Sequence, residues 1–118
     1  MQDNLKKKAE IVQTALNEFG VELNVVQLAA STRSAQEAAA AVGCTLGQIA
    51  KSLVFKGENT QKPILIITSG KNRVNEKAVE AVIKKKLQKA DADFVVEQTG
   101  FSIGGVPPVG HKNPIPIY

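Results

Sequence analysis

The chain has few of the residues with which many enzymes do their chemistry. Among 118 residues there are one cysteine, one histidine and no tryptophan, and aromatic residues make up 4%. Cys44 has no partner for an intrachain disulfide, which is typical of a cytoplasmic protein. A zinc site usually needs three or four Cys, His or carboxylate ligands. We therefore predict neither a metal site nor a cofactor, and a core built from aliphatic residues.

Several sequence signatures are also missing. No uninterrupted apolar run approaches the ~20 residues of a membrane span, so we expect no membrane contact, and the polar and apolar residues of the first segment alternate unlike a signal-peptide core. The G-x-S-x-G, G-x-G-x-x-G and P-loop motifs are absent. A Ser-His-Asp triad through His111 stays formally possible. The common hydrolytic and nucleotide-binding motifs therefore give no assignment.

The charge that is present is mildly basic. The net charge is +4 and the isoelectric point is near 9.3, which permits a polyanionic partner. Lysines cluster at 6–8 and at Lys84, Lys85 and Lys86, both on predicted helices. Each cluster is either a solvated helix face or a contact for a polyanion.

The hydrophobic pattern predicts alternating helices and strands. Apolar residues at helical spacing predict a helix over 3–20, and Ser34 and Thr45 each begin a capping-box pattern that predicts a helix. Further helices are predicted over 75–87 and 91–98, the latter closed by Gly100. Strands are predicted over 21–28, 51–56 and 63–68, and another begins at the end of the chain.

These elements predict one α/β domain over residues 1–118. The segments 51–56 and 63–68 flank a short polar loop and form an antiparallel hairpin, whereas the other elements alternate too loosely for a doubly wound sheet. We therefore expect a mixed, partly antiparallel central sheet flanked by helices.

Lys51 is the charge with the most interesting position. Side chains alternate along a strand, so Lys51 shares a face with Leu53 and Phe55. Its ammonium either extends from the strand's first position to water, or is a fixed cation at the mouth of a pocket that binds a phosphate or a polarised carbonyl.

The segment 101–111 (FSIGGVPPVGH) combines three glycines, two prolines and the only histidine. Glycine lets backbone N–H groups approach a ligand, and proline stiffens the loop, so the segment can present pre-aimed donors. A tight turn uses the same residues. The segment 69–73 (SGKNR) poses the same choice between a polar loop and a site.

Four segments together resemble one family. They are 32–39 (TRSAQEAA), 49–55 (IAKSLVF), 69–74 (SGKNRV) and 99–111 (TGFSIGGVPPVGH), which occur in the family's order. The chain resembles the YbaK/prolyl-tRNA editing-domain family of aminoacyl-tRNA deacylases from about residue 31 to 118. The resemblance implies further strands and a helix beyond the position of Tyr118, and we expect residues 1–118 to form the editing domain without them.

The resemblance implies a function and a set of site residues. It implies an enzyme that hydrolyses, in trans, the ester between a wrong amino acid and the 3′ end of a tRNA, often a tRNA for proline. The resemblance implies two catalytic residues. Lys51 would orient the substrate's carbonyl or terminal phosphate, and the backbone of Gly110 would help to place the carbonyl or the attacking water. Substrate-binding positions are implied at Ser52, Ser69, Gly70, Gly105 and His111, and Lys84, Lys85 and Lys86 are candidates for tRNA contact.

The implied partners are the acceptor end of an aminoacyl-tRNA and, as a second candidate, an aminoacyl-tRNA synthetase. The proline-type motif V-P-P-V-G-H favours the proline-tRNA branches over the cysteine-tRNA branch. The alternative is a non-catalytic relative that binds tRNA or a synthetase, and a small-molecule binding module is a third class. An aminoacyl ester is already activated, so positioning and electrostatics suffice for its hydrolysis.

Overall fold

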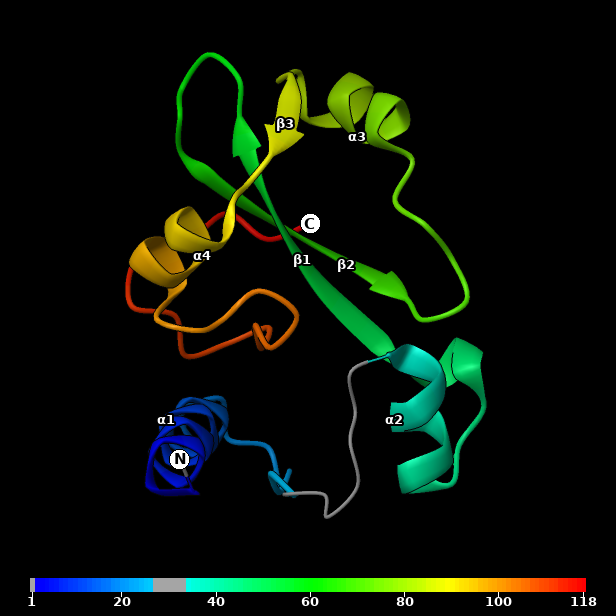
Figure 1. Cartoon of the computed structure of the whole chain (residues 1–118), viewed down its shortest axis with the longest axis vertical. Coiled ribbons are helices and arrows are strands. Elements are labelled where there is room, and N and C mark those ends of the chain that lie inside the picture. The colour runs from blue at the N-terminus through cyan, green and yellow to red at the C-terminus, as the bar shows by residue number, and fades with distance from the viewer. Residues whose placement is uncertain (1, 27–33) are drawn as a thin grey trace.

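The computed structural model describes residues 2–26 and 34–118, and an antiparallel hairpin forms its centre (Figure 1). The elements, in chain order, are α1 (Gln2–Glu18), α2 (Ala35–Val42), the 3-10 turn η1 (Leu46–Gln48), β1 (Ala50–Gly57), β2 (Pro63–Ser69), α3 (Glu76–Ile83), β3 (Leu87–Lys89) and α4 (Ala92–Thr99). The described strands have the order β2-β1-β3, and both pairings are antiparallel. The predicted hairpin is confirmed.

The end of the chain adds a parallel component to the sheet. Ile117 forms an isolated parallel bridge with Leu65 of β2. The N–H of Tyr118 donates to the carbonyl of Leu65 at 2.9 Å, and the N–H of Ile67 donates to the carbonyl of Tyr118 at 2.7 Å. The end of the chain, where a strand was predicted, thus pairs with β2 through one isolated bridge. The predicted mixed sheet flanked by helices is confirmed.

Three helices begin where a short polar side chain caps them. Ser34, Asn75 and Asp91 each accept a hydrogen bond from a backbone N–H of the first turn. Gly43 and Gly100 end α2 and α4 in the left-handed conformation, with φ of 76° and 82°. Glycine is preferred there because it carries no Cβ. The capping patterns in the sequence therefore located these helices.

The predicted helix over 75–87 is too long. It ends at Ile83, because Lys84 adopts the left-handed conformation (φ 57°). The Glu80 carboxylate then accepts a hydrogen bond from the N–H of Leu87 at 2.7 Å, and Leu87 enters the core as the first residue of β3. The sequence pattern did not predict β3, and the placement of Lys84, Lys85 and Lys86 on a helix was wrong.

The predicted strand over 21–28 is also wrong where it is described. Residues 21–26 form no strand; residues 27 and 28, like Thr32 and Arg33 of the first family segment, lie outside the described residues. The side chain of Gln13 in α1 donates to the carbonyl of Leu23 at 2.8 Å and accepts from the N–H of Val25 at 2.7 Å. One helix side chain thus binds the backbone of this segment, although its branched residues favour a strand.

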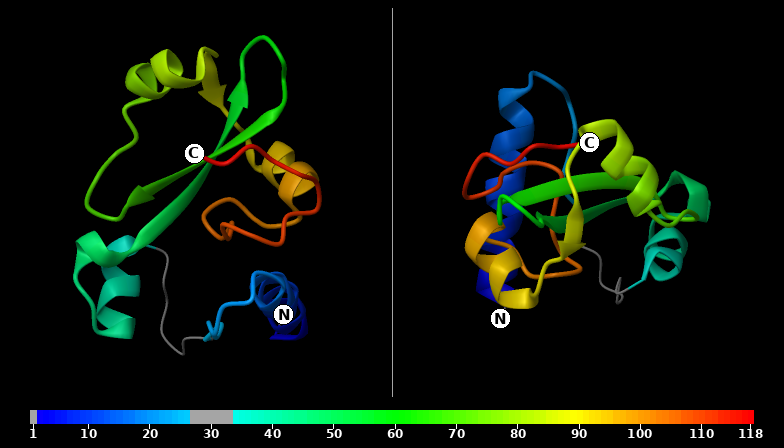
Figure 2. Two further views of the ribbon diagram at one scale, coloured as in Figure 1. Left: turned by 180° about the vertical axis from the view of Figure 1, so that it is seen from behind. Right: turned by 90° about the horizontal axis from the view of Figure 1, so that it is seen from above.

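The two faces of the hairpin bury different elements. Ile64 and Ile66 pack with Leu87 and with α3 residues on one face. Leu65 points to the other face because side chains alternate, and it is fully buried. Val95 of α4 and Phe101, 1% and 5% exposed, are also buried. Figure 2 shows from two further sides that α1 lies beside the segment that follows α4 and away from α2.

Candidate active site

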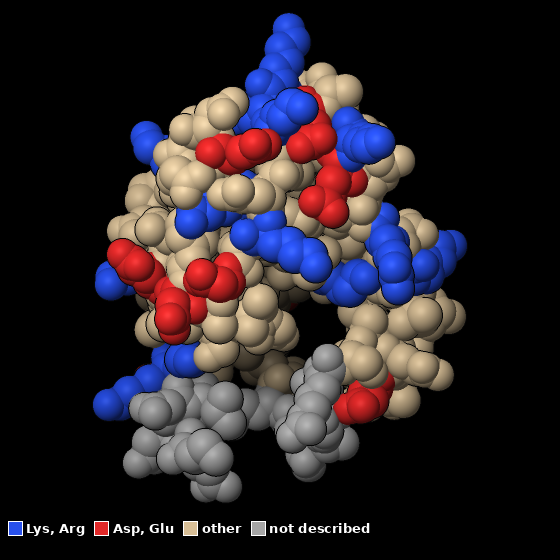
Figure 3. Space-filling model, turned by 45° about the horizontal axis from the view of Figure 1, so that its top comes forward, with Lys and Arg blue, Asp and Glu red and all other residues tan. Residues whose placement is uncertain are grey.

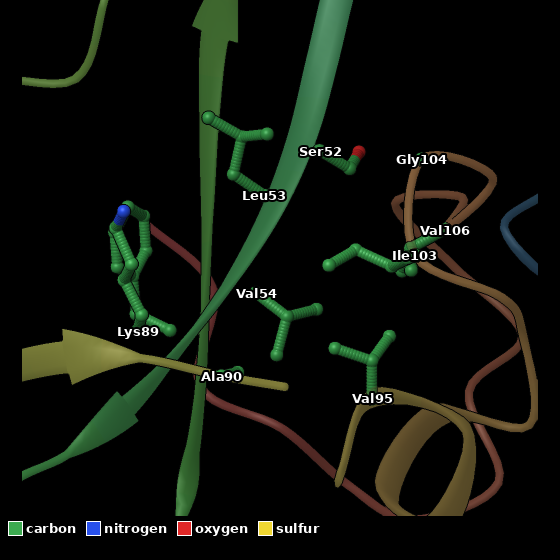
Figure 4. A pocket seen from close by; sticks show the side chains of 10 residues that line it. Ser52, Leu53, Val54, Lys89, Ala90, Val95, Ile103, Gly104 and Val106 are labelled. Carbon is green, nitrogen blue, oxygen red and sulfur yellow. The ribbon is translucent and has the colours of Figure 1, made fainter. Parts of the chain in front are cut away.

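A small, mainly apolar cavity lies along β1. Its volume is about 210 Å³, and it is lined by Ser52, Leu53, Val54, Phe55, Lys89, Ala90, Val95, Ile103, Gly104 and Val106. In Figure 4 the side chains of Ser52, Val54, Val95 and Ile103 lie on the same side of β1, whereas Leu53 and Lys89 lie on the other. The tip of the glycine-rich segment thus forms one wall of a pocket, and a strand and α4 form the others.

The cavity lies along an open edge of the sheet. β3 pairs only with Phe55, Lys56 and Gly57, so no described strand pairs with the start of β1 on that side. Backbone groups of an antiparallel strand alternate between its two edges. The N–H of Gly57 and the C=O of Ile49 form hydrogen bonds on the β2 side. Ser52 and Val54 lie an odd number of residues from these two positions, so their N–H and C=O groups point to the open edge. The cavity therefore has backbone donors and acceptors beside its apolar walls.

Thr99 holds both ends of the glycine-rich segment. Its side chain is fully buried, and its hydroxyl oxygen accepts a hydrogen bond from the N–H of Phe101 at 3.0 Å. Its carbonyl accepts a hydrogen bond from the N–H of Lys112 at 2.9 Å. Its hydroxyl lies 2.7 Å from the carbonyl of Val95, to which it donates. One residue thus closes residues 100–111 into a loop.

Gly110 and His111 lie at the far end of that loop. Gly110 has φ of 81°, and a Cβ there would lie 3.4 Å from Ile11 Cγ2 and 3.6 Å from Ala15 Cβ, so glycine also permits the contact with α1. The Nε2 of His111 lies 2.6 Å from the carbonyl of Pro107. A carbonyl only accepts, so Nε2 carries the hydrogen and Nδ1 is the nitrogen left for another partner.

Lys51 lies on the opposite face of β1 from Ser52. Its Nζ donates to the carbonyl of Asn72 at 2.8 Å, and it is absent from the walls of the cavity. Lys51 is therefore grouped with the loop after β2, and Gly110 is grouped with α1. The structure does not bring these two predicted catalytic residues into contact.

The polar groups of Ser69 and Gly70 are used within the protein. The Ser69 hydroxyl donates to the carbonyl of Gly47 at 2.7 Å, and the N–H of Gly70 donates to the carbonyl of Ile49 at 2.6 Å. A Cβ at Gly70 would lie 2.6 Å from the carbonyl oxygen of Leu46. These two residues lock the loop after β2 against η1.

The remaining predicted residues lie apart from one another. Gly105 is exposed and its N–H donates to the carbonyl of Ser102 at 2.8 Å, which makes a tight turn next to the cavity. Lys84, Lys85 and Lys86 are exposed. The Lys86 carbonyl accepts from the N–H of Glu58, just beyond β1. Glu58 lies seven residue steps after Lys51 along extended chain, which spans roughly 23 Å at about 3.3 Å per residue.

Sequence reasoning missed most of the cavity. Ile103, Val106 and Val95 supply apolar walls, but single apolar residues carry no signal of a ligand. The alternation of β1 is the signal that separates Ser52 from Lys51, and the prediction applied it only to Lys51, Leu53 and Phe55. Thr99 has no predicted role beyond its place at the start of a family motif.

The described residues hold neither a metal cluster nor a membrane helix. Within residues 2–26 and 34–118, no group of three or more His, Cys, Asp or Glu residues is placed to hold a metal ion. Among the described helices, none has the length and apolar character needed to cross a bilayer.

Comparison with known proteins assigns the family. A family model described as "Aminoacyl-tRNA editing domain" matches residues 29–118. The chain belongs to the aminoacyl-tRNA editing domain family. The resemblance seen in the sequence is thereby confirmed, and aminoacyl-tRNA editing is the activity with which the family is associated.

Relatives of this editing domain are described only in general terms. Uncharacterized protein YwhH of Bacillus subtilis (strain 168) is 34% identical over 107 residues, which cover 91% of this chain and 68% of YwhH. A crystal structure described as "a putative trans-editing enzyme for prolyl tRNA synthetase" is 50% identical, with a TM-score of 0.85. It covers 93% of this chain and 69% of its own.

Proposed function

We propose that this editing domain is an aminoacyl-tRNA deacylase that hydrolyses the ester of a mischarged tRNA in trans, with a tRNA for proline as substrate. The observation that carries the proposal is the apolar cavity beside the open edge of β1, in a chain of the editing-domain family. The proline tRNA is taken from the description of the 50% identical protein. A synthetase for the same amino acid is the partner we propose beside the tRNA.

The size of the cavity favours a single small side chain. Pockets for drug-sized ligands measure roughly 300–1,000 Å³, and this cavity of about 210 Å³ is smaller. Most of the residues that line it are apolar: valine, isoleucine, leucine, phenylalanine and alanine. The polar residues among them are Ser52 and Lys89, and Gly104 adds no side chain. We therefore propose a small apolar amino acid as the group removed from the tRNA.

The chemistry requires positioning rather than a strong base. Water adds to the ester carbonyl, negative charge develops on its oxygen, and the ester C–O bond breaks as the ribose oxygen takes a proton. The described residues that line the cavity include no carboxylate and no imidazole, which is consistent with assistance by the neighbouring ribose hydroxyl, as the resemblance implies and as we propose. Backbone N–H donors that point to the oxyanion stabilise such a step, and those of Ser52 and Val54 point to the cavity.

Lys51 and the glycine-rich loop keep the roles that the resemblance implied, as part of the proposal. Gly110 would help to place the carbonyl or the water, and Gly105 and His111 would line the substrate's path. Lys51 precedes Ser52 at the start of β1, and its ammonium donates a hydrogen bond to the Asn72 carbonyl. This position suits the terminal phosphate better than the carbonyl.

The same position of Lys51 favours the second candidate function, a non-catalytic module that binds tRNA or a synthetase. A panel of charged tRNAs separates the two. The deacylase should hydrolyse alanine esters of a proline tRNA faster than phenylalanine esters, which the cavity would not hold. Release of no amino acid from any charged tRNA would favour the binding module.

Replacement of the ammonium tests the catalytic role of Lys51. Lys51→Ala should slow deacylation about ten- to 150-fold, because a hydrogen bond to a charged group such as the terminal phosphate contributes about 1.5–3 kcal/mol. Lys62→Ala, an exposed lysine in the hairpin loop, is the matched control and should leave the rate unchanged. A Lys51→Ala variant with normal turnover would show that this lysine only extends from a strand end into water.

A further inference from the structure

A second concavity lies on the α3 face of the hairpin. It is an open groove of about 460 Å³ between β2, the loop after it and α3, lined by Ile66, Ile67, Thr68, Asn72, Arg73, Val74, Asn75, Ala78, Val79 and Tyr118. Its floor is aliphatic and its rim carries two amides, a guanidinium and a phenol. Neither the deacylation chemistry nor the cavity along β1 uses these groups.

The loop that carries the rim is rigidly attached. Ser69 and Gly70 bond it to η1 at 2.7 and 2.6 Å, and Lys51 donates to its Asn72 carbonyl at 2.8 Å. The stem of Lys71 packs against Gly47, with Cδ 3.2 Å from the position of a Cβ there. The backbone of the loop and the stem of Lys71 are therefore held against η1.

The charge at this end of the hairpin favours an anion. Lys51, Lys71 and Arg73 gather around one loop, and between Glu37 and Glu76 the only carboxylate in the sequence is Glu58, at the other end of β1. Glu37 and Glu76 begin the two flanking helices and leave the cations in excess. In Figure 3, Lys and Arg side chains form a band across the drawn face, with Asp and Glu side chains mostly above and below it.

The rim also carries groups that recognise a base. Tyr118 is 51% exposed, and its backbone is held by β2, which leaves the ring at the edge of the groove. The Asn75 oxygen caps α3, so its amide N–H groups are the part left to donate. An aromatic ring, amide donors and neighbouring cations are the combination by which proteins bind a nucleotide of a single strand.

We propose that this groove binds a nucleotide of the single-stranded acceptor end of the tRNA, one that precedes the terminal aminoacyl-adenosine. Its phosphate lies at Lys71 and Arg73, and its base stacks on Tyr118. The strand passes around the Ala50–Ser69 end of the hairpin, where the α3 face and the cavity face meet. The inference rests on the proposed function for the identity of the RNA.

Binding of a four-nucleotide RNA that ends in CCA tests the groove. The double variant Lys71→Gln/Arg73→Gln should flatten the slope of log K against log salt by about 0.7, because one phosphate is proposed to lie at both side chains and each neutralised phosphate of a single strand contributes about 0.7. The control Lys7→Gln/Lys62→Gln removes two exposed lysines elsewhere and should keep the wild-type slope. Equal slopes in the two double variants would overturn the proposal.

Tyr118 gives an independent test by fluorescence anisotropy. Tyr118→Ala should weaken binding of the same RNA about five- to 150-fold, the equivalent of about 1–3 kcal/mol per stacked base, whereas Tyr118→Phe should bind as the wild type does. Equal affinity of the Ala and Phe variants would rule out stacking at this ring.

The failure of this inference differs from the failure of the proposed function. An aminoacyl-adenosine ester lacks the preceding nucleotide, so the variants at 71, 73 and 118 should hydrolyse it at the wild-type rate. If the protein hydrolyses the ester but its RNA binding is unaffected by the changes at 71, 73 and 118, only the groove proposal is overturned. If RNA binding is weakened by the changes at 71, 73 and 118 but no ester is hydrolysed, the groove proposal is supported and the deacylase proposal is overturned.

Discussion

At the scale of single residues, Thr99 matters most to the shape of the site. Its buried hydroxyl bonds to the backbone of Phe101 and its carbonyl to that of Lys112. A side chain without a hydroxyl leaves the buried N–H of Phe101 without a partner, and an unsatisfied buried group costs about 1–3 kcal/mol. The loop that carries Ile103 and Gly110 therefore depends on two oxygen atoms of one residue, the hydroxyl and the carbonyl of Thr99.

Two substitutions at Thr99 separate its hydroxyl from its methyl group. Thr99→Val keeps the shape and should lower the free energy of unfolding by about 1–3 kcal/mol. Thr99→Ser keeps the hydroxyl and removes one buried methyl group, for about 0.5–1.5 kcal/mol. Urea unfolding measures both, and a valine variant at least as stable as the serine variant would contradict the assigned hydrogen bonds.

At the scale of elements, η1 packs against the loop after β2, which carries Lys71 and Arg73. This packing sets the position of that loop. Gly70 permits it, because a Cβ there would lie 2.6 Å from the Leu46 carbonyl oxygen, 3.0 Å from Ile49 Cβ and 3.1 Å from Ala35 Cβ. All three neighbours are backbone or Cβ atoms, which do not move away as the end of a long side chain does. A side chain at position 70 would therefore meet η1 and the start of α2 at once.

Replacement of Gly70 tests this packing. Gly70→Ala should cost about 1–3 kcal/mol of stability, as is usual when atoms are added to a well-packed site. The control is Gly105→Ala, whose Cβ would meet only the Ser102 carbonyl oxygen at 3.5 Å, and it should change stability by no more than about 0.5 kcal/mol. Equal midpoints of thermal unfolding for the two variants would show that η1 and the loop are not tightly packed.

At the scale of the whole molecule, the basic side chains are divided between two ends of β1. Lys51, Lys71 and Arg73 lie at its start, and Lys84, Lys85 and Lys86 lie beyond its end, where the Lys86 carbonyl bonds to Glu58. The roughly 23 Å between the ends allow one tRNA to reach both. The tRNA phosphates neutralised at each end then contribute separately to the salt dependence of binding.

Charge reversal at the far end tests this division. Changing Lys84, Lys85 and Lys86 to Glu should weaken binding of an intact charged tRNA and flatten its salt slope, by about 0.7 for each single-strand phosphate that the lysines no longer neutralise. Hydrolysis of an aminoacyl-adenosine ester should stay the same, because the three lysines are absent from the cavity walls. An unchanged salt slope would identify the triple lysine as a solvated turn.

The family, the hairpin and the starts of three of the four described helices could be predicted from the sequence, because their signals are local. A cap residue at Ser34, Asn75 or Asp91 acts within one turn, and the alternation of β1 and β2 sets which side chains share a face. The segments 49–55 and 99–111 were specific enough to indicate the editing domain without any knowledge of the fold.

The grouping of the site residues, by contrast, depends on contacts between distant parts of the chain. Residues 21–26 pair with a glutamine side chain of α1, and Lys84 ends α3 early so that Leu87 reaches the core. Lys51 and Ser52 are neighbours in the sequence, yet they serve opposite faces of one strand. The cavity forms where Val95 and Ile103 meet an edge of β1 that β3 is too short to cover. Such interactions join residues far apart in the chain, and no local pattern specifies them.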